Sequence, residues 1–529
     1  MKMVKDLFKN RISGDFKKIL FFNIIVFLFA VSFCILSVQL IPISKVTNFK
    51  FEIYSTLIVV FIVGIVFGEK IIRKDLEYFK ERKGLTLFIF FFALLFSRKL
   101  MLSKGNAVVS LIPYDVVNLF SHKWFFISFF AGFVLLVFVI NGIVNFLRDF
   151  FKTLNKWDKR AYFITTVVTT LFIIVLYTMK SGWYLQYDRV FSIDSGWCFK
   201  NIMPFANYYD IRHPMLSIFT FPVWTFVSTM VNVLTGSAHL GVVFKAIFLQ
   251  IINAQLLIFI GLFLKKITNN KNVFIIYMLS FPTLTYLAFF EKYQLCVFLM
   301  VLYVYCVVFK KNGNFSFVLA SGVMPTSGFL GILELLKKEK FKNKVINILK
   351  IVCFAIIFSF CIGRAHLFNA GFDEIFHMSD KFQNETLTVQ SKVFATLNLL
   401  QDSIYSVGTG HSGKAYLWND LVSSVPYVGI MVLFVCIVGF IVKRKELISK
   451  ISLIWILFAF LLFVKIGWAA HESCLFNIYF SWAVIPLFVY GIDYFIKLFK
   501  FSSKVSYSLL YIFMAVVNFA TILDIYKYI

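Results

Sequence analysis

Several short motifs that carry well-known chemistry are missing from this sequence. It has no HExxH zinc motif, no P-loop and no GxSxG elbow, so none of the reactions that depend on them is indicated. None of its eight cysteines belongs to a CxxC pair. Cys198 and Cys474 could form a bridge, but two free thiols are the favoured interpretation. Scattered His and Asp residues could bind a divalent ion, yet no tight ligand spacing indicates one, so we expect no cofactor.

Charged residues are also scarce, and acidic ones most of all. They make up 15% of the 529 residues, hydrophobic residues make up 60%, and the mean hydropathy is +0.84, which excludes a water-soluble globule. The 53 Lys and Arg outnumber the 26 Asp and Glu, giving a net charge of +27. Because the basic residues fall in short runs between apolar segments, the pattern indicates membrane orientation. We therefore expect membrane lipids, and no nucleic acid, as partners.

Long apolar runs predict an all-α polytopic membrane protein with about 13–15 transmembrane helices. Each run has about 17 to 25 mostly apolar residues, the length that crosses a bilayer. One piece, residues 215–234, is expected to lie at the outer surface instead, because a crossing there would strand three lysines outside. The Pro and Gly of MPTSG predict two half-helices within 315–336. The expected spans are 19–41, 51–68, 85–102, 124–146, 161–179, 240–264, 273–289, 294–309, 315–336, 345–363, 425–442, 451–468, 475–496 and 505–523.

The charge pattern also predicts an orientation and a division into three parts. Basic loops place the N-terminus in the cytoplasm, and no cleavage site follows the first apolar run. We expect a four-helix membrane extension over 1–160, a transmembrane core over 161–496 and a final transmembrane helix over 497–529. The core carries two outer loops, 180–239 and 364–424. No soluble domain or fixed-period repeat is evident.

A polar and aromatic stretch, Trp183–Pro214, lies between two strongly apolar regions. Its carboxylates Asp188 and Asp194 follow an outward span, where burial beside the membrane boundary could raise a pKa and let one of them accept a proton. The alternative is that an Asp in this stretch pairs with Arg189 or Arg212 and only fixes the loop. Asp194 is favoured as a general base.

Further candidates lie at the predicted outer ends of helices. These side chains could bind substrate or simply be solvated. Lys465 lies in an apolar span, which is costly without an anion and suggests a lipid phosphate, although snorkelling to the interface explains it equally well. Arg364 has the same two interpretations, with a planar donor fork that suits phosphate. The remaining candidates are Asp210, Arg212, His213, Glu291, Lys292, His471 and Glu472.

Five segments, taken in order, resemble the GT-C superfamily of membrane glycosyltransferases, including its aminoarabinose transferase and protein mannosyltransferase branches. The likeness runs from Ala161 to about Ile496, while the first ~150 residues form an addition large enough to be a module. The paired acids at the start of the loop in relatives are spread into Asp188 and Asp194 here. The segments are IDSGWCFKNI, YYDIRHPML, LSFPTLTYLAFFEKYQLCVFLMVLYVY, GVMPTSGFLGI and IWILFAFLLFVKIGWAAHESCLFNIYFSWAVIPLFVYG.

The resemblance implies a GT-C-like core with outer juxtamembrane helices and an inverting sugar transfer. The donor would be a polyprenyl-phosphate-linked sugar and the acceptor a cell-envelope glycan, lipid or protein, at the outer face of a bacterial plasma membrane. Asp194 would be the base, with Asp188 as the alternative. Asp210, Arg212 and His213 would shape the pocket, and Lys465 and Arg364 would face the donor phosphate. The rival interpretations are a transporter or flippase of a lipid-linked saccharide, an envelope polymer ligase or polymerase, and a non-catalytic partner of another transferase.

Overall fold

The computed structural model describes most of the chain from residue 144 onward, together with isolated residues before it. The described residues are 84, 87, 144–179, 195–199, 213, 215–216, 220, 223–224, 227–228, 230–231, 234, 238–311, 313–337, 339–357, 359, 388–406, 410–412, 415–417, 427–466 and 476–528. Contacts divide the chain into two compact units. One comprises Met1–Asn155, Ser228–Met230 and Ile357–Phe368, and the other comprises the rest. The domain boundaries expected from the sequence stay predictions.

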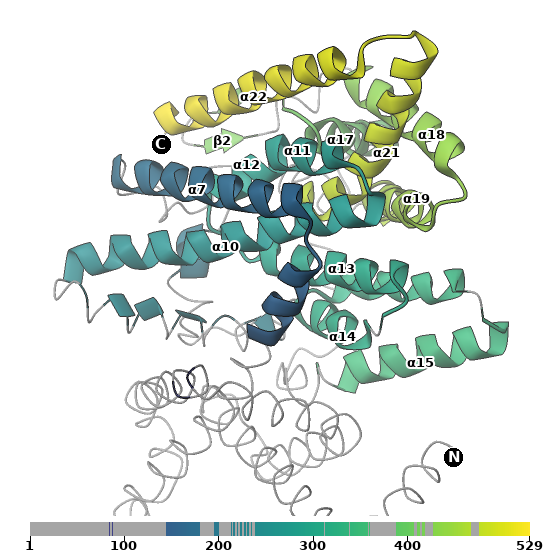
Figure 1. Cartoon of the computed structure of the whole chain (residues 1–529), viewed down its shortest axis with the longest axis horizontal. Helices are drawn as coiled ribbons and strands as arrows, with labels where there is room; N and C mark the ends of the chain where they lie inside the picture. The colour runs from purple at the N-terminus through teal and green to yellow at the C-terminus, as the bar shows by residue number, and fades with distance from the viewer. Residues whose placement is uncertain are drawn as a thin grey trace, which may run out of the picture. The chain divides into compact units, whose positions relative to one another are not determined.

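The second unit is a helical bundle with several helices that can cross a membrane (Figure 1). Among the described residues, five helical segments are long and apolar enough for a crossing. Shorter apolar helices accompany them, so the predicted all-α, multi-pass membrane class is confirmed. The five segments belong to α7 (Lys156–Met179), α10 (Ala238–Thr268), α19 (Leu447–Phe460) with the π-helical turn η9 (Leu461–Ile466), α21 (Ile478–Leu498) and α22 (Ser503–Tyr528).

The shorter apolar helices include the predicted broken pair. It consists of α14 (Asn314–Val323) and the 3-10 helix η5 (Pro325–Leu336), separated at Met324, whose backbone is extended. Pro325 starts the second piece because it has no N–H to offer the preceding turn. The other two shorter apolar helices are α13 (Tyr293–Val308) and α18 (Tyr427–Lys443). α15 (Phe341–Ile357) covers most of the span expected over 345–363.

One expected span is interrupted. Residues 273–289 were predicted as a single crossing, but α11 (Lys271–Leu279) and α12 (Phe281–Ala288) meet at Ser280, whose backbone is extended. Pro282 near the start of α12 has no N–H for the turn before it. The N–H of Phe281 instead donates to the carbonyl of Ile404, at 3.2 Å. A neighbouring segment thus satisfies the backbone that the break releases, as apolar surroundings require.

Two elements lie in the long loop predicted over 364–424. Helix α17 (Val389–Asp402) is N-capped by Thr388, whose hydroxyl accepts a hydrogen bond from the N–H of Ser391 at 3.1 Å. Strands β1 (Gly410–Ser412) and β2 (Ala415–Leu417) pair antiparallel, with His411 opposite Tyr416. The sequence had indicated only a polar loop here. α17 packs on α18 and on η9, which makes it part of the bundle.

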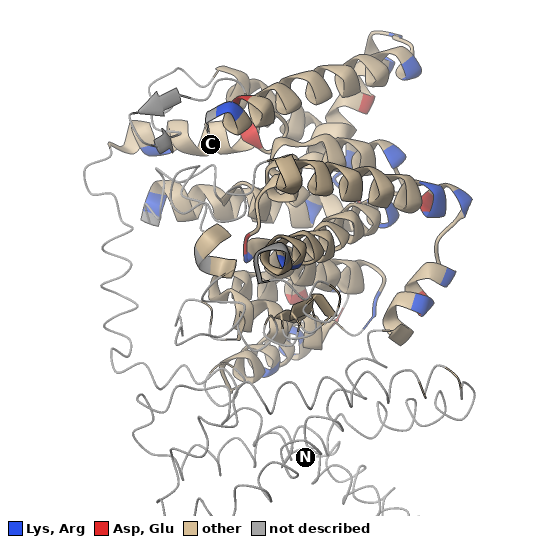
Figure 2. Ribbon diagram, turned by 90° about the vertical axis from the view of Figure 1, so that its left-hand side faces the viewer, with Lys and Arg blue, Asp and Glu red and all other residues tan. Residues whose placement is uncertain are grey.

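Close helix packing at glycines holds α18 against α21. A Cβ on Gly439 would lie 2.0 Å from the carbonyl oxygen of Leu487, and one on Gly491 would lie 2.1 Å from that of Val435. Small residues let membrane helices approach this closely and gain dispersion contacts. α10 packs on both α7 and α13, and α11 contacts α21 and α22. Charges gather at helix ends and turns, while the sides of the helices carry few (Figure 2).

Candidate functional site

Of the predicted site residues, the structure describes His213, Glu291, Lys292 and Lys465. The other seven lie outside the described residues, and their roles stay predictions. They are Asp188, Asp194, Asp210, Arg212, Arg364, His471 and Glu472.

The turn between α12 and α13 buries two opposite charges side by side. Glu291 is 3% exposed and Lys292 is 9% exposed. The Glu291 Oε2 atom accepts a hydrogen bond from the backbone N–H of Lys292 at 2.8 Å. The Lys292 ammonium lies 5.3 Å from the centre of the Tyr293 ring, within cation–π range. Charged groups are seldom buried unless they are paired or functional, so this turn is the centre of the candidate site.

Cys198 brings the polar stretch onto this turn. Its side chain is 1% exposed and is a free thiol, in agreement with the favoured interpretation of the sequence. The Cys198 Sγ atom donates to Glu291 Oε2 at 3.6 Å. It follows the short helix α8 (Ser195–Trp197), and Ser195 is also fully buried. The segment that begins directly after Asp194 in the sequence is therefore anchored at Glu291.

Two buried glutamines hold the end of α12 below this turn. The Gln250 amide of α10 donates to the carbonyls of Tyr286 and Leu287, both at 2.8 Å. The Gln294 amide of α13 donates to the Tyr286 carbonyl at 3.2 Å and the Phe289 carbonyl at 3.4 Å. The last carbonyls of a helix have no partner within the helix, so these amides fix the position of the turn. Sequence reasoning missed both glutamines, although Gln294 is the one amide side chain of the apolar helix α13 and Gln250 is one of three in α10.

An aromatic cluster links the turn to η9. The Tyr293 ring lies 5.3 Å from that of Tyr479 and 5.9 Å from that of Phe476. The Phe476 ring is 6.5 Å from that of Phe463, which belongs to η9. Rings at these separations attract one another and restrict their mutual movement. Lys465 follows two residues after Phe463, so the elements that carry Lys292 and Lys465 are joined through one cluster.

Lys465 itself lies at the end of its apolar span. The span runs over Leu447–Lys465, and the side chain is exposed. No hydrogen bond or ion pair joins Lys465 to another side chain among the described residues. Both the phosphate-binding and the snorkelling interpretations place the ammonium at the boundary of the membrane, and the observed position fits either one.

His213 caps the broken helix pair. Its Nδ1 atom lies 2.9 Å from the carbonyl oxygen of Val323, and because a carbonyl only accepts, Nδ1 carries the hydrogen. Two residues later, the N–H of Met215 donates to the Gly322 carbonyl at 2.9 Å. These bonds satisfy carbonyls at the end of α14 that the break leaves open. His213 thus has a structural role in addition to the pocket role expected for it.

A second buried acid lies at the end of α17. Asp402 is fully buried, and neither carboxylate oxygen has a hydrogen-bond partner. Burial raises the pKa of Asp402 well above its ordinary range, since the charged form loses its hydration. The next turn of chain packs on α22, where the Asn518 Oδ1 atom accepts from the Ser406 N–H at 3.1 Å. The sequence predicts only an outer loop over 364–424, so the burial of Asp402 was not expected from it.

Within the part of the chain that the structure describes, no group of three or more His, Cys, Asp or Glu side chains could hold a metal ion. Searches against family models, curated proteins and solved structures find no match to this chain. Function is therefore inferred from its own residues.

Proposed function

We propose that this chain is an integral membrane glycosyltransferase that moves a sugar from a polyprenyl-phosphate donor to an acceptor of the cell envelope. One observation carries the proposal. The Cys198 thiol, four residues after Asp194, contacts the buried carboxylate of Glu291 beside Lys292. The segment with the candidate base Asp194 is thereby tied to the turn that carries the buried cation Lys292. Transfer from a phosphate donor needs a base for the acceptor's proton and a cation beside the leaving phosphate.

The reaction would proceed by a single displacement. An acceptor hydroxyl or amine attacks the anomeric carbon from the side opposite the phosphate and forms the new glycosidic bond. The bond from that carbon to the phosphate oxygen breaks, and polyprenyl phosphate leaves with the bonding electrons. The acceptor's proton passes to the carboxylate of Asp194, or of Asp188 in the alternative assignment. The configuration at the anomeric carbon inverts.

The buried turn would serve the leaving group. Negative charge grows on the phosphate as the bond breaks, and a positioned ammonium stabilises that charge more in a poorly hydrated site than in water. Lys292 is the buried candidate for this task, and Lys465 is an exposed one linked to it through the Tyr293, Phe476 and Phe463 rings. Glu291 acts as a positioning residue, since it bonds Cys198 and the N–H of Lys292.

The direct test uses the purified full-length protein in lipid nanodiscs with radiolabelled polyprenyl-phosphate sugars and extracted envelope as acceptor. Asp194→Asn is expected to fold normally and to lose transfer by about 10²–10⁴-fold, the usual contribution of a general base. Asp188→Asn is measured beside it, and Glu339→Gln, at an exposed acid, is the matched control. Full activity in both Asp188→Asn and Asp194→Asn would remove the carboxylate base from the proposal.

A second experiment separates positioning from catalysis. Glu291→Gln keeps an acceptor for the Lys292 N–H but weakens that bond by removing its charge. We expect about a tenfold loss in kcat/KM, equivalent to ~1.4 kcal/mol, with the dependence of kcat/KM on pH unchanged. If Glu291→Gln shifts the pH dependence of kcat/KM, Glu291 would instead be the base.

A transporter of lipid-linked saccharides is the second candidate, because one observation favours it. Asp402 is an unpartnered buried acid, and two residues later Ile404 bonds across the break between α11 and α12. Buried acids beside interrupted helices are features of proton-coupled carriers. In proteoliposomes, the carrier would move labelled lipid between leaflets without releasing polyprenyl phosphate. The transferase would release polyprenyl phosphate.

A further inference from the structure

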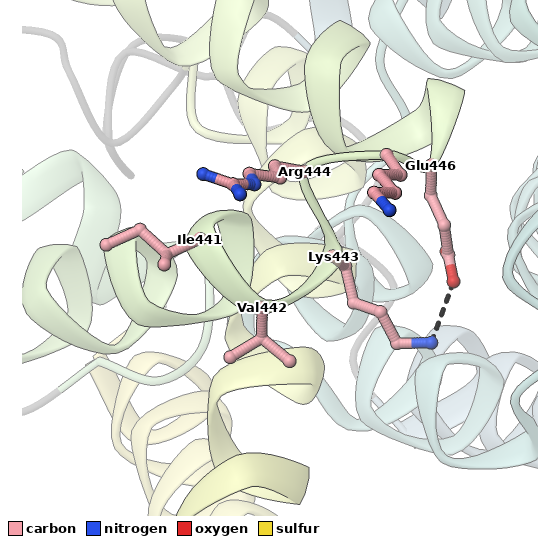
Figure 3. Close-up of a pocket in the computed structure, with 6 residues that line it drawn as sticks. Ile441, Val442, Lys443, Arg444 and Glu446 are labelled. Atoms are coloured by element: carbon pink, nitrogen blue, oxygen red, sulfur yellow. Dashed lines mark hydrogen bonds and ion pairs between the residues drawn. The ribbon is translucent and has the colours of Figure 1, made fainter.

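The turn between α18 and α19 forms a hollow of about 530 Å³ with an excess of positive charge (Figure 3). Its lining carries three cations and a single acid, Glu446. Both oxygens of that acid are already engaged. Lys443 pairs with Glu446 Oε1 at 2.7 Å, and the hydroxyl of Tyr490 donates to Oε2, also at 2.7 Å. The acid therefore cannot neutralise the remaining cations. The lining residues are Ile441, Val442, Lys443, Arg444, Lys445 and Glu446.

Arg444 and Lys445 keep their charge available. Both are exposed, and neither forms a hydrogen bond or an ion pair with another described residue. Figure 3 shows the guanidinium of Arg444 pointing away from the Lys443–Glu446 pair. A planar guanidinium binds two oxygens of one phosphate, and an adjacent ammonium adds a point charge. The hollow is thus suited to a phosphate-bearing anion.

An exposed apolar face of α18 leads directly into this hollow. Met431 is 66% exposed, Phe434 57% and Ile441 56%, and the helical spacing of three to four places them on one face. The opposite face of α18 is buried and includes Cys436 and Gly439. From Met431 to Ile441 the helix rises about 15 Å, roughly half the hydrocarbon thickness of a bilayer. That distance matches the acyl chain of a lipid in one leaflet.

We propose that this turn and this face form a binding site for an anionic phospholipid. The phosphate lies in the hollow against Arg444 and Lys445, and an acyl chain follows Ile441, Phe434 and Met431. A free phosphate would use the hollow alone, whereas a lipid would also contact the apolar face that leads into it. The site is held in place from α21, because Tyr490 fixes Glu446. The turn itself is thereby positioned before the lipid binds, which favours affinity.

The test measures retention of lipid by the full-length protein. Protein in detergent is mixed with phosphatidylglycerol or phosphatidylcholine, and bound lipid is counted by native mass spectrometry. The wild type is expected to retain phosphatidylglycerol at least tenfold better than phosphatidylcholine. Arg444→Gln with Lys445→Gln is expected to remove that preference. The matched control, Lys497→Gln with Lys504→Gln, removes the same charge from exposed positions in another turn and is expected to keep it.

Two further outcomes decide between sources of the anion. Phe434→Ser with Ile441→Ser is expected to lower phosphatidylglycerol retention about tenfold, because each exposed side chain would lose its contact with the acyl chain. Competition by millimolar inorganic phosphate as strong as that by phosphatidylglycerol would overturn the lipid site in favour of a free-anion site. Equal losses in the Lys497→Gln, Lys504→Gln control would show that net charge alone holds the lipid, and would also overturn the proposal.

Discussion

Replacing Gly439 with alanine is expected to separate α18 from α21. The new Cβ would lie 2.0 Å from the carbonyl oxygen of Leu487 and 2.8 Å from the backbone nitrogen of Gly491. Carbon and oxygen atoms approach to about 3.3 Å at best, so the helices must move apart by about 1.3 Å at this point. A gap of about 0.5–1 Å already forfeits a quarter to a half of a dispersion contact, so a separation of about 1.3 Å loses more than that from each contact it opens.

The cost should lie at the upper end of what overpacking usually produces. Inserting a methyl group into a packed interior costs about 1–3 kcal/mol. Because the atoms opposite Gly439 are backbone atoms, they cannot rotate away as a side chain could. We therefore expect Gly439→Ala to lower the free energy of unfolding by about 3 kcal/mol, or about 100-fold in the population of separated helices.

Cys436 provides a local measurement of this separation. Its thiol is 2% exposed and lies 3.7 Å from the carbonyl oxygen of Val484, at the same helix pair. The rate of alkylation at Cys436, read by peptide mass spectrometry, should rise by about 100-fold in Gly439→Ala if labelling requires the helices to part. Gly328→Ala is the control, because its Cβ would meet only the Ser321 hydroxyl, at 3.7 Å. Equal rates in the two variants would refute the close-packing argument.

Three further changes test other parts of the bundle. Asp402→Asn should stabilise the protein at pH 8 and make its free energy of unfolding less dependent on pH. Burial raises the pKa of Asp402 in the folded protein. The wild type is therefore most stable below the ordinary carboxyl pKa and loses stability as the pH rises toward the raised value. Gly322→Ala should loosen the segment that caps α14, since the new Cβ would meet the Met215 sulfur at 2.2 Å; limited proteolysis would detect this. Lys265→Met should cost about 3–5 kcal/mol because it removes the ammonium that lies 2.6 Å from the buried Asp158 carboxylate. Thermal unfolding in detergent would measure it.

Each of these changes has a matched comparison. Glu339→Gln, at an exposed acid, is expected to change the free energy of unfolding by less than about 0.5 kcal/mol at low pH and at pH 8. If the free energy of unfolding of Asp402→Asn falls with pH as steeply as that of the wild type, the raised pKa of Asp402 is contradicted. Gly322→Ala is read against Gly328→Ala. Adding Asp158→Asn to Lys265→Met should recover most of the lost stability, whereas additive losses would mean that the two charges do not interact.

Hydropathy alone determined the membrane class and the positions of most described spans. The reason is that a helix needs about 20 apolar residues in a row to cross a bilayer, and such a run is visible in the sequence. The predicted spans 161–179 and 505–523 fall within α7 and α22. The break at Pro325 was also readable, because proline lacks the N–H that a continuous helix needs.

The sequence was less informative where one segment satisfies another. The break at Ser280 was missed although Pro282 is nearby, because hydropathy continues unchanged through the break. α17 was missed because its mean hydropathy is too low for a span, and its burial comes from contacts with α18 and η9. Asp402 lies within the predicted outer loop, yet its side chain is fully buried in the structure.

The sequence by itself determined that this protein lies in a membrane, and which segments carry charge. Only the tertiary structure decided which of those charges meet. Cys198 and Glu291 are separated by 93 residues, and their contact depends on how the segment after α8 packs on the turn between α12 and α13. The composition and periodicity of a segment predict whether it lies in the membrane or in water, because both are properties of neighbouring residues. Contacts between distant residues follow from packing, which no single segment specifies.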